Sequence, residues 1–249
     1  MDRHVVITGA AGGIGAATVD VFLSAGWEVW AVDRSSGRGI PAGATFIQAD
    51  VSDPKQVGSL FDRLSDQLSR LDALVNNAAI QICKPLVETS VEEWDEVLNS
   101  NLRSIFLTSR AAFPLLKAAQ GAVVNVSSVH ALATSRDISS YAASKGGILA
   151  LTRAMALEFS RDGIRVNTVL PGAVDTPMLR EGLERGHAGD GSVEDRMRAL
   201  ADKTALGRVG RPEEIGKAIF FLAEPEHSSF ITGQALVVDG GATARLSTE

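Results

Sequence analysis

The chain lacks the features of a membrane protein, a disulfide-stabilised fold or a multi-cysteine metal cluster. No apolar run approaches the roughly 20 residues that a membrane-spanning helix requires, and the N-terminus has no signal-peptide hydrophobic segment. A single cysteine, Cys83, excludes an internal disulfide and a cluster of cysteine ligands. We therefore expect a cytoplasmic protein with no membrane partner and no metal.

Positive charge is also scarce. There are 24 Lys and Arg residues against 30 Asp and Glu residues, which gives a net charge of -6. This balance argues against nucleic acid or an anionic membrane as the main partner, and leaves a small molecule. The 249 residues are 45% hydrophobic and 22% charged, which is ordinary for a globular protein with a substantial core.

What the sequence contains is a regular alternation of short apolar segments with longer helical patterns. The apolar segments are apolar throughout, as expected for parallel strands covered on both faces. This predicts an α/β fold: one doubly wound domain over residues 1–249, with a mostly parallel seven-stranded sheet and helices on both faces. The expected strands are His4–Thr8, Glu28–Asp33, Thr45–Ala49, Ala73–Asn76, Ala122–Ser127, Arg165–Leu170 and Ala235–Val238, and the expected helices are Ile14–Ala25, Pro54–Ser69, Val91–Ala119, Ser139–Ser160 and Pro212–Ala223.

The alternation breaks between Thr176 and Arg208. There the strand signal disappears, and glycines interrupt a charged, weakly helical sequence. The segment follows the C-terminal end of a strand, where ligands bind in such sheets, so residues 176–208 are predicted to form a substrate lid. The alternative is a surface excursion without functional motion.

A glycine-rich segment joins the first expected strand to the first helix. It runs from Thr8 to Gly15 and contains four glycines. Glycine permits a sharp turn with positive φ and lets main-chain N–H groups approach a phosphate, while the next helix offers its free N–H groups. The segment predicts a pyrophosphate site of a dinucleotide.

The acid at the end of the second expected strand bears on the choice of dinucleotide. Asp33 can accept hydrogen bonds from ribose hydroxyls and would repel a 2′-phosphate, which favours NAD over NADP. Arg34 follows directly, and its guanidinium can pair with a 2′-phosphate. NAD is therefore the expected cofactor, and NADP is the alternative.

The single tyrosine of the chain, Tyr141, lies four residues before Lys145 and thirteen after Ser128. In a helix, this spacing places the phenol and the ammonium group on one face. A neighbouring cation favours the phenolate, so Lys145 is expected to lower the Tyr141 pKa from its usual value of about 10. The arrangement predicts a proton-transfer site. The alternative is a tyrosine packed on a helix beside a solvated lysine.

These features resemble the short-chain dehydrogenase/reductase family along nearly the whole chain. The glycine segment matches the family's Thr-Gly-x-x-x-Gly-x-Gly. Asn76-Asn77-Ala78-Ala79 is similar to its Asn-Asn-Ala-Gly, with alanine in place of the last glycine. The resemblance implies a Rossmann-type oxidoreductase whose catalytic residues are Asn101, Ser128, Tyr141 and Lys145.

The resemblance also implies cofactor contacts in several segments. Asp50 looks like the acid that reaches the adenine, while Val174 and Thr176 look like contacts to the nicotinamide amide. The expected cofactor-binding residues are Gly9, Gly13, Ile14, Gly15, Asp33, Arg34, Asp50, Val51, Asn77, Ala78, Tyr141, Lys145, Pro171, Gly172, Val174 and Thr176.

The predicted reaction interconverts a secondary alcohol and a ketone, or a hemiacetal and a lactone, with Tyr141 as proton donor or acceptor. Ser128 would hold the reacting oxygen. Asn101 would fix a water on the proton path, or would satisfy a bulge in its helix.

Polar residues near the site favour an oxygenated substrate such as a sugar, a polyol or a hydroxy acid. The candidate substrate residues are Gln81, Ser128, His130, Arg136 and Tyr141. Leu132, Met178, Leu179 and Leu183 leave open a hydrophobic pocket, and with it an NADP-dependent reductase of hydrophobic ketones. A non-catalytic dinucleotide sensor is the further alternative.

The helices Val91–Ala119 and Ser139–Ser160 carry apolar residues over more than one face. These residues are Ile105, Phe106, Leu107, Leu151, Met155 and Phe159. With the resemblance, they predict a homotetramer or a homodimer. The alternative is that they complete the core of a monomer.

Overall fold

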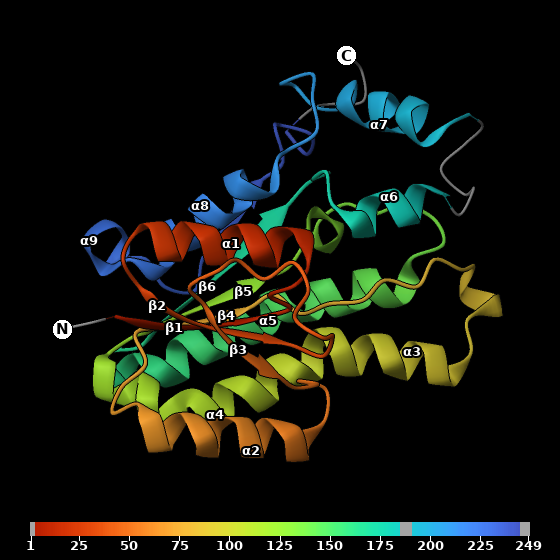
Figure 1. Cartoon of the computed structure of the whole chain (residues 1–249). Helices are drawn as coiled ribbons and strands as arrows, with labels where there is room; N and C mark the ends of the chain where they lie inside the picture. Colours follow the sequence, from red (N-terminus) through yellow and green to blue (C-terminus); the bar gives the residue numbers. More distant parts are fainter. Residues whose placement is uncertain (1–2, 185–190, 245–249) are drawn as a thin grey trace.

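The structure of the chain, a computed structural model, describes residues 3–184 and 191–244. Seven parallel strands form one sheet in the order β3-β2-β1-β4-β5-β6-β7. Helices cover both faces of this sheet (Figure 1). The predicted doubly wound α/β fold is confirmed, and each strand ends within one residue of its expected position. The strands are β1 His4–Thr8, β2 Glu28–Asp33, β3 Thr45–Gln48, β4 Ala73–Asn76, β5 Ala122–Val126, β6 Arg165–Pro171 and β7 Ala235–Val238.

Two hydrophobic cores lie on opposite faces of the sheet. On one face, α1 (Gly13–Ser24) and α8 (Pro212–Ala223) pack against each other and on the sheet. On the other face lie α2 (Pro54–Gln67), α4 (Ser104–Ala119) and α5 (Ser139–Phe159). Because the strands are buried on both faces, they tolerate few polar residues, which explains their continuous apolar sequences.

The strand order reverses between β1 and β4. From β1 the chain winds outward through β2 and β3, and it then returns to place β4 on the other side of β1. The two connections leave the sheet in opposite directions at this point, so a crevice opens beyond the carboxyl ends of these strands. The predicted site residues follow these ends.

The predicted single helix Val91–Ala119 is wrong in one respect. The structure has α3 (Val91–Leu98), a π-helical turn (Asn99–Arg103) and then α4. A π turn inserts an extra residue, which rotates Asn101 into the interior, where its side chain is fully buried. The Asn101 amide bonds both main-chain groups of Ile80, donating to its oxygen at 3.0 Å and accepting from its nitrogen at 2.8 Å.

The segment predicted to be a lid contains two helices, α6 (Pro177–Glu184) and α7 (Val193–Ala201). The Arg180 side chain pairs with Asp175 at 2.7 Å and lies 3.6 Å from Glu194, so it joins the start of the segment to α7. Residues 185–190 of the predicted lid lie outside the described residues. Motion of the lid stays a prediction.

The apolar residues expected at a subunit interface divide into two groups. Ile105 and Met155 are buried in the core, and Leu107, Leu151 and Phe159 are partly buried against it. Phe106 on α4 remains 50% exposed, and Leu157 on α5, which was not among the predicted residues, is 77% exposed. Part of the predicted surface therefore completes the core of one chain.

None of the described helices is long and apolar enough to cross a membrane.

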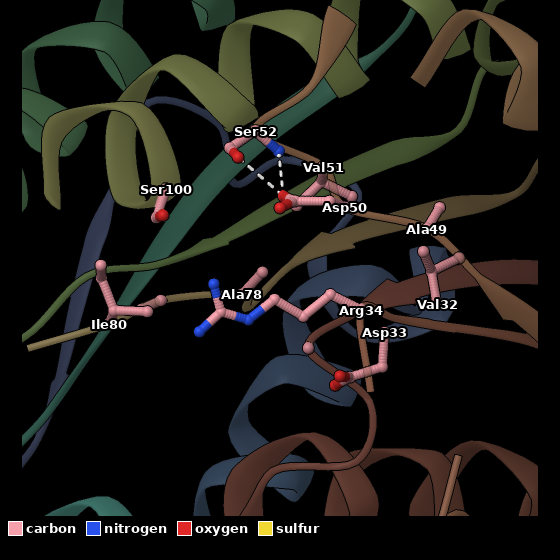
Figure 2. Close-up of a pocket in the computed structure, with 12 residues that line it drawn as sticks. Val32, Asp33, Arg34, Ala49, Asp50, Val51, Ser52, Ala78, Ile80 and Ser100 are labelled. Atoms are coloured by element: carbon pink, nitrogen blue, oxygen red, sulfur yellow. Dashed lines mark hydrogen bonds between the residues drawn. The ribbon is translucent and has the colours of Figure 1, made fainter. Parts of the chain in front are cut away.

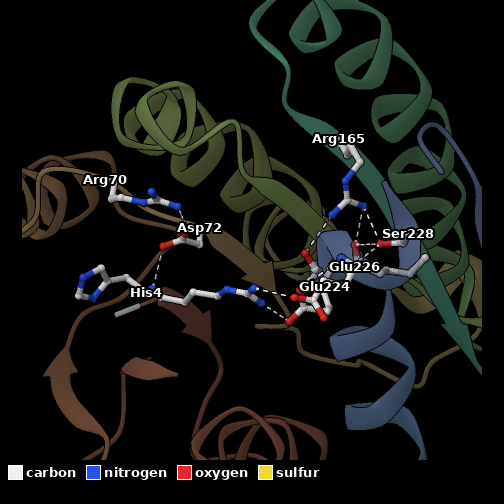
Figure 3. A network of polar contacts seen from close by, with 10 residues as sticks. His4, Arg70, Asp72, Arg165, Glu224, Glu226 and Ser228 are labelled. Carbon is white, nitrogen blue, oxygen red and sulfur yellow. Dashed lines mark hydrogen bonds and ion pairs between the residues drawn. The ribbon is translucent and has the colours of Figure 1, made fainter. Parts of the chain in front are cut away.

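Arg165, at the start of β6, fastens the C-terminal end of α8 to the sheet (Figure 3). Its guanidinium donates to the carbonyl oxygens of Leu222 and Ala223 at 2.8 and 2.9 Å, and to the Ser228 hydroxyl at 2.9 Å. The last carbonyls of a helix have no partner within the helix, so a partly buried cation is well suited to satisfy them. Nearby, the buried Glu224 accepts from Arg3.

The Arg165→Met variant should lower the free energy of unfolding by about 2–4 kcal/mol, because it removes donors from buried carbonyls and a cation from beside Glu224. The control is Arg161→Met, which removes a cation from an exposed position four residues away. Urea denaturation of both variants measures the difference. An equal loss in the two variants would contradict this role for Arg165.

Candidate active site

The glycine loop approaches the end of β4 so closely that side chains would not fit. Gly9 has a φ of +64°, and a Cβ atom placed there would lie 2.7 Å from the Ala78 Cα. A Cβ at Gly15 would lie 2.0 Å from the Gly9 oxygen. The loop therefore needs glycine at both positions to bring its main chain against β4 and the start of α1. An open N-terminus of α1 beside a narrow glycine turn suits a pyrophosphate group.

Side chains from β1 and β4 hold the loop in this conformation. The Asn77 amide donates to the oxygens of Thr8 and Gly9, each at 3.0 Å. In return, the Thr8 hydroxyl accepts from the main-chain nitrogens of Asn77 at 3.0 Å and Ala78 at 3.2 Å. The side chain of Asn77 therefore braces the glycine loop, and its predicted contact with the cofactor stays a prediction.

A cavity of about 110 Å³ opens beside the loop, at the carboxyl ends of β1, β2, β3 and β4. Six predicted cofactor residues line it: Gly9, Asp33, Arg34, Asp50, Val51 and Ala78. Six further residues line the cavity and were not among the predicted cofactor residues. Most of them directly adjoin a predicted one. They are Val32, Ala49, Ser52, Ala79, Ile80 and Ser100.

Two carboxylates and one guanidinium face this cavity (Figure 2). Asp33 accepts from the main-chain nitrogens of Ala11 at 3.0 Å and Ser35 at 2.9 Å, which fixes the carboxylate beside the glycine loop. Asp50 accepts from the nitrogen and hydroxyl of Ser52, at 2.8 and 2.7 Å. Figure 2 shows the Arg34 side chain extending across the cavity toward Ala78, between these two acids. Such a pocket fits the adenosine half of a dinucleotide.

The other predicted cofactor residues lie outside this cavity. Gly13, Ile14 and Gly15 begin α1, and Thr176 lies against that turn: a Cβ on Gly13 would be 2.8 Å from the Thr176 methyl carbon. Four more predicted residues lie at the end of β6 and after it: Pro171, which ends the strand, and Gly172, Val174 and Thr176, which follow it. Gly172 packs against Asp239, and Val174 is buried beside Gly210. The segment thus passes in front of the glycine loop, where a nicotinamide end would extend.

Tyr141 and Lys145 lie on the first turns of α5, and Ser128 follows β5. The Lys145 ammonium donates to the Val126 oxygen at 2.9 Å and lies 5.3 Å from the centre of the Tyr141 ring. Both side chains are buried, with Lys145 only 2% exposed. The burial of Lys145 excludes the alternative of a solvated lysine. The Ser128 hydroxyl makes a hydrogen bond with the Tyr141 side chain. The structure therefore brings together the three predicted groups.

The expected effect of Lys145 on Tyr141 is absent from this structure. Burial raises the pKa of Tyr141 to about 12, and the hydrogen bond from Ser128 opposes this only in part. Burial also lowers the pKa of Lys145 to about 7, because desolvation penalises the ammonium form. A lysine with this pKa is largely neutral above pH 7 and gives little support to a phenolate. Burial decides both values here, and the spacing in the sequence could not reveal it.

Asn101 connects the π turn to α5. Its amide donates to the Ser144 hydroxyl at 3.0 Å, and that hydroxyl donates to the Tyr141 carbonyl oxygen at 2.7 Å. With the two bonds to Ile80, Asn101 satisfies the bulge, as one of its two predicted roles requires. Its role in fixing a water stays a prediction. Ser144 was not predicted, although its position between Tyr141 and Lys145 is a usable signal.

Of the predicted substrate residues other than Ser128, His130 packs against the tyrosine ring. The centres of the His130 and Tyr141 rings are 5.9 Å apart, and the rings meet edge to face. Gln81 donates to the Cys83 thiol at 3.0 Å. Arg136 is exposed, and within the described part of the chain it makes no hydrogen bond or ion pair. Of the apolar candidates, Leu183 is buried.

The described residues contain no group of three His, Cys, Asp or Glu side chains that could hold a metal ion. The titratable and hydrogen-bonding groups around Tyr141 are the Ser128 hydroxyl, the Lys145 amine and the His130 imidazole. These groups can hold an oxygen and move a proton.

Comparison with known proteins places this geometry in a family. Residues 9–243 match the family model described as enoyl-(acyl carrier protein) reductase. The chain is 38% identical to a cyclopentanol dehydrogenase from Comamonas testosteroni, over 98% of both proteins, and 35% identical to a meso-2,3-butanediol dehydrogenase from Serratia marcescens, over 98% of this chain and 95% of that one. The ligand-free structure of an aldohexose dehydrogenase from Thermoplasma acidophilum superimposes with a TM-score of 0.93 at 32% identity, covering 99% of this chain and 96% of that one.

These matches extend over almost the whole chain, and the solved structure shares its fold. Members of such a family use a nicotinamide dinucleotide, and the cavity beside Asp33 and Arg34 fits its adenosine half. The chain belongs to the short-chain dehydrogenase/reductase family.

Proposed function

We propose that the protein is an NAD-dependent oxidoreductase that interconverts a secondary alcohol and a ketone, or a hemiacetal and a lactone. The observation that carries this proposal is the buried group of Ser128, Tyr141 and Lys145 at the carboxyl end of β5. The relatives support the reaction class, since cyclopentanol, butanediol and aldohexose dehydrogenases all act on CH–OH groups.

In the oxidative direction, the Tyr141 hydroxyl takes the proton of the substrate alcohol, and in reduction it returns the proton. Ser128 holds the reacting oxygen by a hydrogen bond, which stabilises negative charge that develops there. The bound nicotinamide supplies the acceptor or donor of hydride. The three side chains therefore orient the oxygen and move one proton.

Proton removal by Tyr141 requires its pKa to fall from about 12. A protonated Lys145 is the group that can lower it, because a cation near the ring favours the phenolate. Further acceptors beside the Lys145 ammonium, such as hydroxyl groups of a bound ligand, raise the Lys145 pKa. Ligand binding thereby shifts both groups toward the active pair that the sequence predicted.

The cofactor is NAD in this proposal, because the fixed Asp33 carboxylate lies in the adenosine cavity and would repel a 2′-phosphate. Arg34 in the same cavity supports NADP as the alternative. The substrate is an oxygenated small molecule, a sugar, polyol or hydroxy acid, held near Gln81, Ser128 and His130. The exposed Phe106 and Leu157 support a homotetramer or homodimer.

A panel of secondary alcohols, polyols and aldoses, with NADH absorbance as the readout, tests the proposed function. Turnover by the wild-type protein is the expected result. Binding of NAD without turnover of any substrate would favour a dinucleotide sensor.

The Tyr141→Phe variant should lose nearly all turnover, because it deletes the transferable proton and little packing. NAD affinity, measured by isothermal titration calorimetry, and the melting temperature should remain close to the wild-type values. A variant that keeps more than about a tenth of the wild-type kcat would show that another group carries the proton.

The Asp33→Ser variant should raise the ratio of kcat/KM for NADP to that for NAD by roughly tenfold or more, because it removes repulsion of a 2′-phosphate. Asp33→Asn keeps an acceptor for the loop nitrogens and removes the same charge, so it should raise the ratio in the same direction as the Ser variant does. Adding Arg34→Gln to the Ser variant should reverse the gain. The reading of Asp33 is wrong if the wild-type protein already prefers NADP.

The buried Lys145 predicts a pH dependence of stability in the ligand-free protein. Its pKa of about 7 lies below the usual value of about 10.4, so between these values the unfolded chain binds more protons than the folded one. Stability due to this residue therefore rises with pH across this window, by at most about 1.4 kcal/mol per pH unit.

Urea denaturation of the wild-type protein and of Lys145→Met, at pH 7.5, 8.5 and 9.5, measures this effect. The difference in free energy of unfolding, wild type minus variant, should increase with pH. Because the two proteins share all other titratable groups, the subtraction removes the contribution of those groups to the pH dependence. A constant difference would show that Lys145 titrates near its ordinary pKa in the folded protein.

A further inference from the structure

His130 is fixed beside both groups that hold the reacting oxygen. It lies in the short helical turn Val129–Ala131, and its main-chain nitrogen donates to the Ser128 hydroxyl at 3.3 Å. Its ring meets the Tyr141 ring edge to face, with the ring centres 5.9 Å apart. His130 is therefore linked to Ser128 through its main chain and to Tyr141 through its ring.

The two nitrogens of the His130 ring differ in their surroundings. Nδ1 lies 3.2 Å from the Thr134 hydroxyl, which fixes the orientation of the ring. Nε2 has no hydrogen-bond partner among residues 3–184 and 191–244. The ring is partly exposed, so Nε2 is the nitrogen that remains for a ligand.

Burial lowers the pKa of His130, so the ring is neutral at physiological pH. A neutral imidazole offers one donor and one acceptor nitrogen, and whichever of these Nε2 becomes, it can bond a hydroxyl. The carboxylate of a hydroxy acid, in contrast, binds a cationic side chain better than a neutral imidazole. The cation among the predicted substrate residues, Arg136, is exposed on the loop between His130 and α5 and has no partner in the described ranges. Among the proposed substrate classes, these properties favour an uncharged hydroxyl compound over a hydroxy acid.

We propose that His130 determines specificity by binding, through Nε2, a second substrate oxygen on the carbon next to the reacting carbinol. The preferred substrates are then vicinal diols, and the products are α-hydroxy ketones. Neighbouring oxygens of such a diol are separated by about one hydrogen-bond length. This matches a residue tethered directly to Ser128 and packed on Tyr141. The inference rests on the proposed function and narrows its substrate class.

The experiment compares 1,2-cyclohexanediol with cyclohexanol, which differ by one hydroxyl group. The wild-type protein should favour the diol roughly tenfold in kcat/KM, mainly through KM, as expected for one hydrogen bond made on binding. His130→Gln places an amide near the position of Nε2 and should retain most of this preference. His130→Asn places its amide near Nδ1 and should lose the preference, as should His130→Phe.

Ser135→Ala is the matched control, because it changes an exposed residue of the same loop and should leave the diol preference unchanged. Thermal melting and NAD binding report whether each variant is folded. If His130→Phe fails to fold, the comparison of the Gln and Asn variants still shows whether the diol preference depends on a group at the position of Nε2. A purely structural role for His130 would change the rates with diol and mono-alcohol equally.

Two results would overturn this inference alone: turnover of both alcohols without preference by the wild-type protein, or an intact preference in the Asn and Phe variants. Failure to turn over any secondary alcohol would overturn the proposed function as well. The two failures are therefore distinguishable.

Discussion

The close approach of the glycine loop to β4 is the contact on which the site depends. Gly9 adopts a left-handed conformation and leaves no room for a side chain against Ala78, and Asn77 ties the loop down by two hydrogen bonds. This contact brings the start of α1 and the cavity beside Asp33 to the same edge of the sheet. Any side chain at Gly9 would push the glycine loop away from Asn77 and Ala78 at the end of β4.

A second constraint fixes the catalytic helix to the sheet. In the interior, Asn76 on β4 donates to Asn125 on β5 at 2.9 Å, and Asn125 in turn donates to Thr152 on α5 at 2.9 Å. The Thr108 hydroxyl on α4 donates to Asn76 at 2.7 Å. Directional bonds between buried polar groups specify the rotation of a helix more sharply than apolar packing does. They hold α5 so that Tyr141 and Lys145 face the end of β5.

The elements that the sequence predicted well are those with local signals. Strands buried on both faces require uninterrupted apolar runs, and the glycine loop requires its glycines because of backbone geometry. The helix Val91–Ala119 was predicted as continuous, and a bulge entered only as one of two roles for Asn101, because Ser100 and Asn101 are acceptable in an ordinary helix. The side chain of Asn101 bonds Ile80, twenty-one residues earlier in the chain, and no local pattern reveals such a contact. The pKa values of Tyr141 and Lys145 could not be predicted for a related reason, because segments distant in the sequence bury these two side chains.

The burial of Lys145 has a consequence for ligand binding as well as for catalysis. A lysine with a pKa of about 7 is only partly protonated in the ligand-free protein at neutral pH. When a ligand binds that holds Lys145 in the ammonium form, the lysine must take up a fraction of a proton from solution. Binding and protonation are linked processes in such a site, so the measured binding enthalpy depends on the ionisation heat of the buffer.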